Sequence, residues 1–141
     1  MIQRIQTVWL LLAAACGFGL TKVPLFSATL PDASTRELIA TESLLFFAIV
    51  IVLSVLALAT IFLFKNRPLQ LKLVIFGIIA SIGVIALEVY EIGVFKTTYA
   101  ITSGTYQWGG LLPIFMLIFF FLASRGIYKD QKLVKSLDRL R

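Results

Sequence analysis

Apolar residues in this chain form long uninterrupted stretches, and the charged residues lie in the segments between them. The clearest stretch runs from Ser43 to Phe64, 22 residues without a charge, with Glu42 before it and Lys65 and Arg67 after it. An α-helix of that length extends about 33 Å, enough to cross the roughly 30 Å hydrocarbon core of a bilayer. A helix that is apolar on every side is typical of a membrane span. The pattern therefore predicts a transmembrane helix over residues 43–64.

Three further stretches predict three further spans, over about residues 5–24, 69–89 and 108–124, followed by a tail over 125–141. The first stretch also has features of a signal peptide, and Ala13 to Cys16 approximates a lipoprotein cleavage site. Its apolar run is longer than a typical signal-peptide core, so we expect it to be retained as a span. The chain is thus interpreted as a single transmembrane domain of four spans.

The charged residues predict an orientation for these spans. The segments assigned to one side carry ten Lys and Arg against two Asp, and the opposite segments carry three cations against five Asp and Glu. Because positively charged loops stay in the cytoplasm, both termini are expected inside. The predicted fold class is an all-α membrane protein: four transmembrane helices in an up-down bundle, with a short amphipathic C-terminal helix on the inner surface.

Composition excludes several classes of protein. The chain is 60% hydrophobic and 14% charged, with a mean hydropathy of +0.98, values far from those of a soluble domain. It has no histidine and one cysteine, Cys16, which argues against histidine-based catalysis, disulfides and paired-cysteine metal sites, so no cofactor is expected. The net charge of +6 is explained by membrane anchoring, and no nucleic-acid partner is expected.

The two outer loops carry different signals. In the first loop, Asp32 to Thr35 followed by Arg36 and Glu37 predicts the N-cap and first turn of a short interfacial helix. In the second, glycines predict turns, and three aromatic residues suit the membrane interface: Tyr99, Tyr106 and Trp108.

The third span carries the candidate site. Its residues Gly77, Ser81, Glu88 and Glu91 share one helical face with Val84, because they recur at steps of three and four. Gly77 and Ser81 form a small-residue pair that allows close helix packing, and Ala13 and Gly17 offer a similar pair on the first span.

Lys22 ends the first span on the same side of the membrane as Glu88 and Glu91, so these three residues are predicted to form an outer polar cluster. Two interpretations stay open for this cluster. It is either an interfacial ion-pair network that locks the bundle, or a site where two carboxylates hold a cation or a proton.

A second candidate surface lies at the inner end. The basic tail places three leucines on one helical face, and Gln3 and Gln6 lie at the inner end of the first span, so we expect these residues to form one cytoplasmic docking face: Gln3, Gln6, Leu133, Leu137 and Leu140. Its partner is expected to be either anionic lipid, attracted by the cations, or a protein that binds the leucine face. A larger membrane complex and a homo-oligomer both remain open.

Both ends of the chain carry specific sequence. The opening MIQRIQTVWLLLAA and the closing SRGIYKDQKLVKSLDRLR resemble an uncharacterised family of small inner-membrane proteins from Bacteroidota, classed as a domain of unknown function. The resemblance implies four spans in a bacterial inner membrane. It implies no activity and no functional residues.

The sequence leads to two hypotheses of function. The first is a non-enzymatic accessory or scaffold subunit of a membrane complex. The alternative is a small transporter, or an ion- or lipid-binding protein that uses the outer carboxylates. A closed, dry bundle with few pockets would favour the first, and an outward-facing cavity that reaches Glu88 or Glu91 would favour the second. No enzyme is expected, because no second catalytic group or substrate pocket is indicated.

Overall fold

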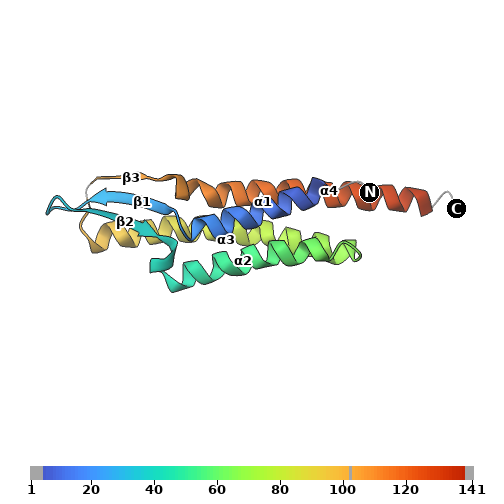
Figure 1. Cartoon of the computed structure of the whole chain (residues 1–141), viewed down its shortest axis with the longest axis horizontal. Coiled ribbons are helices and arrows are strands. Elements are labelled where there is room, and N and C mark those ends of the chain that lie inside the picture. The colour runs from blue at the N-terminus through green and yellow to red at the C-terminus, as the bar shows by residue number, and fades with distance from the viewer. Residues whose placement is uncertain (1–4, 102, 139–141) are drawn as a thin grey trace.

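Four helices lie side by side along most of the molecule in the computed structural model, which describes residues 5–101 and 103–138 (Figure 1). They are α1 (Ile5–Leu20), α2 (Leu44–Phe62), α3 (Arg67–Thr98) and α4 (Leu112–Asp138). Consecutive helices run in opposite directions (Figure 1), α1 packs against α2 and α4, and α3 packs against the same two helices. The fold is therefore mostly helical, with α1 and α3 at opposite corners of the bundle.

Three helical segments are long and apolar enough to cross a membrane. They are Leu44–Phe62, Arg67–Thr98 and Trp108–Ser136, while Ile5–Leu20 is a shorter apolar helix. Polar side chains begin two of these helices. Ser43 accepts a hydrogen bond from the Phe46 amide at α2, and Asn66 accepts one from the Leu69 amide at α3. Capping of this kind satisfies amide groups that have no partner within the helix.

Two helices are longer than the apolar pattern predicts. The third predicted span ends near residue 89, but α3 continues to Thr98. The tail was predicted as a short amphipathic C-terminal helix, and in the structure it is the continuation of α4, which runs to Asp138 without a break. Gly126 is the only glycine in that stretch, and a single glycine costs only about 1 kcal/mol in a helix otherwise rich in good helix formers.

The first outer loop forms strands, and the short interfacial helix predicted there is absent. Strands β1 (Pro24–Thr29), β2 (Thr35–Ile39) and β3 (Gly104–Tyr106) form an antiparallel sheet in the order β2-β1-β3. Phe26, Ala28 and Leu38 are buried and alternate with more exposed residues, which is the period of a strand. This strand pairing overrides the local helix signal. One of the two strand pairs, β1 with β3, joins segments that are far apart in the sequence.

The Asp32–Ser34 pair that resembled a helix cap forms the tip of the β1–β2 hairpin. Asp32 Oδ1 accepts hydrogen bonds from the Ser34 hydroxyl at 2.7 Å and from the Ser34 amide at 3.3 Å. These two hydrogen bonds, with that from the hydroxyl the stronger influence, hold the pKa of Asp32 below its ordinary value. Ala33 between them adopts a left-handed conformation with φ 64°, as tight turns often require.

The sheet lies at the end of the bundle where α3 ends, which we call the sheet end (Figure 1). Phe26 of β1 packs edge-on against Phe95 of α3, with ring centroids 6.3 Å apart. The Lys96 ammonium lies 4.9 Å from the centre of the Phe26 ring, and the Arg36 guanidinium of β2 lies 4.4 Å from that of Tyr99. These contacts fix the sheet on the last turns of α3.

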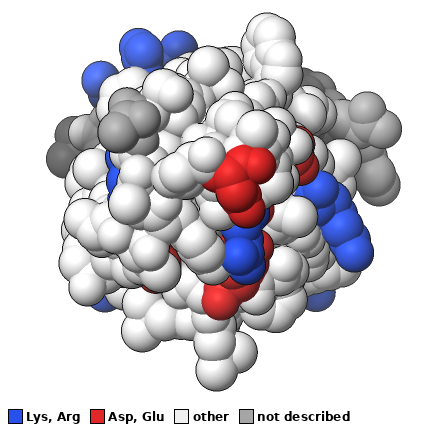
Figure 2. All heavy atoms as spheres, turned by 90° about the vertical axis from the view of Figure 1, so that its left-hand side faces the viewer, with Lys and Arg blue, Asp and Glu red and all other residues white. Residues whose placement is uncertain are grey.

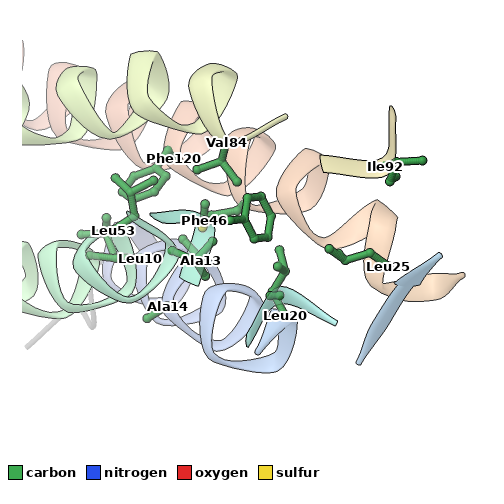
Figure 3. Packing of buried hydrophobic residues seen from close by; sticks show 14 of the residues in the cluster. Leu10, Ala13, Ala14, Leu20, Leu25, Phe46, Leu53, Val84, Ile92 and Phe120 are labelled. Atoms are coloured by element: carbon green, nitrogen blue, oxygen red, sulfur yellow. The ribbon is translucent and has the colours of Figure 1, made fainter. Parts of the chain in front are cut away.

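The bundle interior is filled by apolar side chains from all four helices. Leu10 and Ala13 of α1, Leu53 of α2, Val84 of α3 and Phe120 of α4 lie close to one another in the interior (Figure 3). All five are at most 2% exposed. Close packing of this kind makes the spacing between helices sensitive to added volume.

Candidate functional site

A pocket of about 450 Å³ lies at the sheet end, between α3 and the start of α4. Its walls come from α3, from the segment joining β3 to α4, and from the first turn of α4. We call it the Glu88 pocket, and its lining residues are Ile85, Glu88, Val89, Ile92, Tyr106, Gln107, Trp108, Gly110, Leu111 and Ile114. Glu88 is the only charged residue among them.

Glu88 is buried, with 5% of its surface exposed. A Cβ placed on Gly110 would lie 2.8 Å from Glu88 Oε1, so glycine at this position leaves space for the carboxylate. Among residues 5–101 and 103–138, no side chain or amide forms a hydrogen bond or an ion pair with Glu88. A carboxylate that lacks partners in an apolar environment is unfavourable, because its lost hydration is not replaced.

The segment between β3 and α4 is held against β1 by several contacts. The Gln107 amide donates a hydrogen bond to the Leu25 carbonyl at 3.0 Å, and the Gln107 side-chain nitrogen donates one to Ser27 Oγ at 2.6 Å. Gly109 lies directly against the carbonyl groups of Val23 and Pro24, where no side chain fits. The sheet therefore fixes this wall of the Glu88 pocket.

Two aromatic residues stand at the pocket mouth. Tyr106 is 63% exposed and Trp108 is 80% exposed. The Tyr106 ring packs edge-on against Phe26 at 5.4 Å and has the Lys96 ammonium 5.7 Å from its centre. The Trp108 ring makes no such contact with another described ring or cation.

The three residues of the predicted outer polar cluster do not come together. Glu91 accepts a hydrogen bond from the Ser43 hydroxyl at 2.6 Å, so it faces α2 while Glu88 faces α4. Lys22 is exposed and forms no ion pair in the described part of the chain. Residues three apart on a helix differ by about 60° in direction, which separates the two carboxylates, and α1 lies diagonally across from α3. Of the three, only Glu88 lines the pocket.

The surface around this end carries no large region of one charge. Figure 2 views the sheet end and shows acidic and basic side chains next to each other, while uncharged atoms cover most of the remaining surface. Among the described residues, no group of three or more Cys, Asp or Glu side chains is arranged to hold a metal ion. The Glu88 pocket is therefore an apolar pocket with a single acidic group.

A family described as a domain of unknown function, DUF4293, matches residues 2–140. The chain belongs to this family. The resemblance to an uncharacterised family is thereby confirmed. No curated protein and no solved structure is significantly similar to the chain.

In this DUF4293 chain the four small residues chosen for helix packing are buried. Gly77 lies against the Phe120 ring of α4, and Gly17 lies against Ser54 of α2 and Met116 of α4. Ser81 donates a hydrogen bond to the Gly77 carbonyl at 2.7 Å, and Ala13 is fully buried. The two small pairs thus contact α2 and α4, and neither pairs with the other.

The predicted cytoplasmic docking face is only partly described. Gln6 is 2% exposed and packs against Gly126 of α4, so it belongs to the interior and not to a surface. Leu133 is 63% exposed and lines a shallow hollow of about 320 Å³ with Lys129, Lys132 and Ser136. Gln3, Leu140 and the side chain of Leu137 lie outside the described residues.

The sequence alone did not identify most of the pocket. The sequence predicts Tyr106 and Trp108 at the membrane interface and turns at the glycines of this loop, which include Gly110. It does not predict that these residues lie against Glu88. The one usable signal was an acidic residue at the end of a long uncharged stretch, because a carboxylate next to apolar surroundings is costly unless it has a partner or a function. The partner segment lies about 20 residues further along the chain, and its pairing with β1 helps to hold it against α3.

Proposed function

We propose that this protein is an integral inner-membrane protein with four spans and both termini in the cytoplasm. Four apolar helices in an antiparallel bundle support the proposal, as does the concentration of Lys and Arg at the end opposite the sheet. The 16 residues of α1 reach about 24 Å, and Lys22 can extend its ammonium group toward water. The sheet end would then face the outside.

Cysteine labelling tests this topology. With Cys16 replaced by serine, Ser103→Cys is expected to react with a membrane-impermeant maleimide added to intact cells. Ser136→Cys is expected to react only after the membrane is opened, because α4 would carry it to the cytoplasmic side. Both serines are exposed, so accessibility and not burial decides the result. The reverse pattern would contradict the proposed orientation.

The function that the geometry favours is binding of a membrane-soluble small molecule in the Glu88 pocket. The observation that carries it is a cavity of about 450 Å³ that reaches a carboxylate without a partner among the described residues. Glu88 lies 16 positions after Lys72 on α3, or about 24 Å, so in the proposed orientation the pocket would lie near the outer boundary of the hydrocarbon core. Exposed Val89 and Ile114 at its rim would face the acyl chains, so a ligand would enter from the lipid.

The proposed function is binding or transport, without catalysis of a reaction. A hydrolytic or transfer reaction needs a nucleophile, an acid or base and a group that stabilises the developing charge. The polar side chains of the lining are the Glu88 carboxylate, the Gln107 amide, which already donates to Ser27, the Tyr106 hydroxyl and the Trp108 indole N–H. None of them is an activated nucleophile beside a base. We therefore propose that Glu88 recognises a ligand and does not transform it.

Filling the pocket tests the binding function independently of charge. Ile114 and Ile118 are one helical turn apart on α4 and are 42% and 43% exposed, but only Ile114 lines the pocket. The wild-type protein, purified in a mild detergent, is expected to retain a small amphiphile detectable by native mass spectrometry. Ile114→Trp is expected to lose it, because indole fills the cavity, and Ile118→Trp to keep it. Equal retention in both variants, or no retained molecule in the wild type, would contradict the proposal.

An accessory-subunit function is the second candidate, and one feature favours it. The C-terminal part of α4 extends beyond the other helices (Figure 1), with Leu133 and Val134 exposed among lysines. A mild-detergent pull-down would then recover a stoichiometric protein partner that Leu133→Glu loses and Ile114→Trp keeps. Recovery of the chain alone or with itself, or with anionic lipid only, would argue against an accessory role.

A further inference from the structure

We infer that the ligand of the Glu88 pocket is an amphiphile with an ammonium head, either a free long-chain amine or a lipid. Its head lies at Glu88, and its apolar chain is directed into the bilayer. The inference rests on the proposed binding function and names the chemistry of the ligand. Three features of the pocket carry it: the carboxylate without a counter-charge, the free indole ring, and the apolar walls.

The Glu88 carboxylate is suited to binding a cation. The Asp32 and Glu91 carboxylates both accept hydrogen bonds from serine, Asp32 from Ser34 and Glu91 from Ser43. Glu88 is the most buried acidic residue of the described chain, yet it has no such donor there. A buried charge becomes favourable when an opposite charge and its hydrogen bonds replace the lost water. An ammonium group supplies both.

An inorganic cation does not fit this pocket. Calcium takes six to eight oxygen ligands and magnesium requires a nearly complete octahedron, about six. The described lining provides one carboxylate, and the remaining walls are mainly apolar. An organic cation needs fewer oxygens, because its own carbon atoms contact the apolar walls.

The aromatic residues suit an ammonium head. Positive charge is attracted to the face of an aromatic ring, and tryptophan is the strongest host among the side chains. Tyr106 already has the Lys96 ammonium near its ring, whereas the Trp108 ring at the same mouth has no cation among the described residues. Glu88 and Trp108 therefore offer an anion and a ring to one positively charged head.

The apolar walls accommodate the chain of the same molecule. Ile85 and Val89 of α3 face Leu111 and Ile114 of α4 across the pocket, and three of these four side chains are at least 40% exposed: Val89, Leu111 and Ile114. These side chains lead from Glu88 to the outer surface of the bundle. A ligand with an ammonium head and an alkyl chain matches this order of polar and apolar groups.

Fluorescence quenching tests the ligand class. The chain has two tryptophans, and Trp9→Phe leaves Trp108 as the only one. Trp9 stacks on Phe119 at 6.0 Å, so phenylalanine preserves a ring at that position. The protein in uncharged dodecyl maltoside micelles is titrated with 6-bromododecylamine, and separately with 6-bromododecan-1-ol, so that the short-range quencher lies near the head of each probe. The amine is expected to quench Trp108 at roughly tenfold lower concentration, the gain typical of one charge-assisted hydrogen bond.

Two variants show whether Glu88 causes the difference. Glu88→Gln is expected to abolish the preference for the amine, because the amide has the shape of the acid but no charge. Glu91→Gln, one turn away and facing α2, is expected to keep it. A preference that survives in Glu88→Gln, or equal quenching by amine and alcohol in the parent, would overturn the inference.

The outcomes separate this inference from the proposed function. Equal quenching by both probes that Ile114→Phe abolishes would mean that the pocket binds amphiphiles without recognising charge, so only the inference fails. Phenylalanine fills the pocket here without adding a second tryptophan, and quenching that is insensitive to it would contradict the binding function as well. If the amine probe is preferred, competition shows whether the ammonium group of the ligand belongs to a lipid or to a free amine. Displacement of the bromoamine by phosphatidylethanolamine but not phosphatidylglycerol indicates a lipid headgroup, and displacement by dodecylamine alone indicates a free amine, both in agreement with the inference.

Discussion

Replacing Gly77 by leucine is expected to destabilise the helical bundle by about 1–3 kcal/mol, the cost of forcing extra volume into a packed interior. Even the first added carbon has no room. A Cβ at this position would lie 2.7 Å from Phe120 Cε1 and 2.9 Å from Phe120 Cδ1. Phe120 is fully buried, so its ring cannot turn toward a free surface. The change is measured as a shift in the midpoint of unfolding by sodium dodecyl sulfate in mixed micelles.

Gly83 provides the matched control on the same helix. A Cβ on Gly83 would have no other atom within 4 Å, so leucine there adds volume outside the bundle. Gly83→Leu is expected to leave the midpoint unchanged or to raise it slightly, because leucine favours helix more than glycine does. If the two variants unfolded at the same midpoint, the contact between α3 and α4 would not depend on the small residue.

Gly109→Ala is expected to have an effect of similar size, about 1–3 kcal/mol, although it adds a single methyl group. The added carbon would meet the carbonyl groups of Val23 and Pro24, which are backbone atoms of the segment leading into β1. Backbone held by a sheet yields less readily than the end of a flexible side chain. The same displacement would move Trp108 and Gly110, so we expect loss of the bound amphiphile together with the loss of stability.

The control for Gly109→Ala is Gly93→Ala, at a helical position where an added Cβ meets no other atom within 4 Å. Unfolding and ligand retention are measured on both variants. Gly109→Ala with normal stability and normal ligand retention would mean that the close approach of β1 and the β3–α4 segment is not required.

The sequence predicted what depends on local composition. Long apolar stretches predicted four helices, and all four are present. Helices α3 and α4 continue beyond the predicted spans, because hydropathy marks where a helix leaves an apolar environment and not where its hydrogen bonds stop. The β1–β2 hairpin was not predicted. Asp and Ser side chains can stabilise either a hairpin tip or the start of a helix, and here Asp32 and Ser34 form a hydrogen bond at a hairpin tip.

The candidate site was predicted less completely than the fold. Glu88 was predicted as one member of an outer polar cluster with Lys22 and Glu91, and in the structure it lines a cavity that neither of the other two residues lines. Helical periodicity states which residues share a side of one helix, and it does not state which neighbouring helix lies against that side. The structure assigns Glu91 to α2 and Glu88 to α4, a division that only the order of helices around the bundle decides.

The unbroken course of α4 has a mechanical consequence. Ile114 at the pocket and Leu133 at the far end belong to one helix of 27 residues, about 40 Å long. Gly126 is the only glycine along it, and its one proline, Pro113, lies in the first turn, so the helix moves as a stiff rod. A change of about 5° in its tilt at the pocket would displace the opposite tip by roughly 3 Å, given that length. In the proposed membrane orientation such a rod would act as a lever, so that a ligand bound in the Glu88 pocket would shift the position of the opposite tip near Leu133.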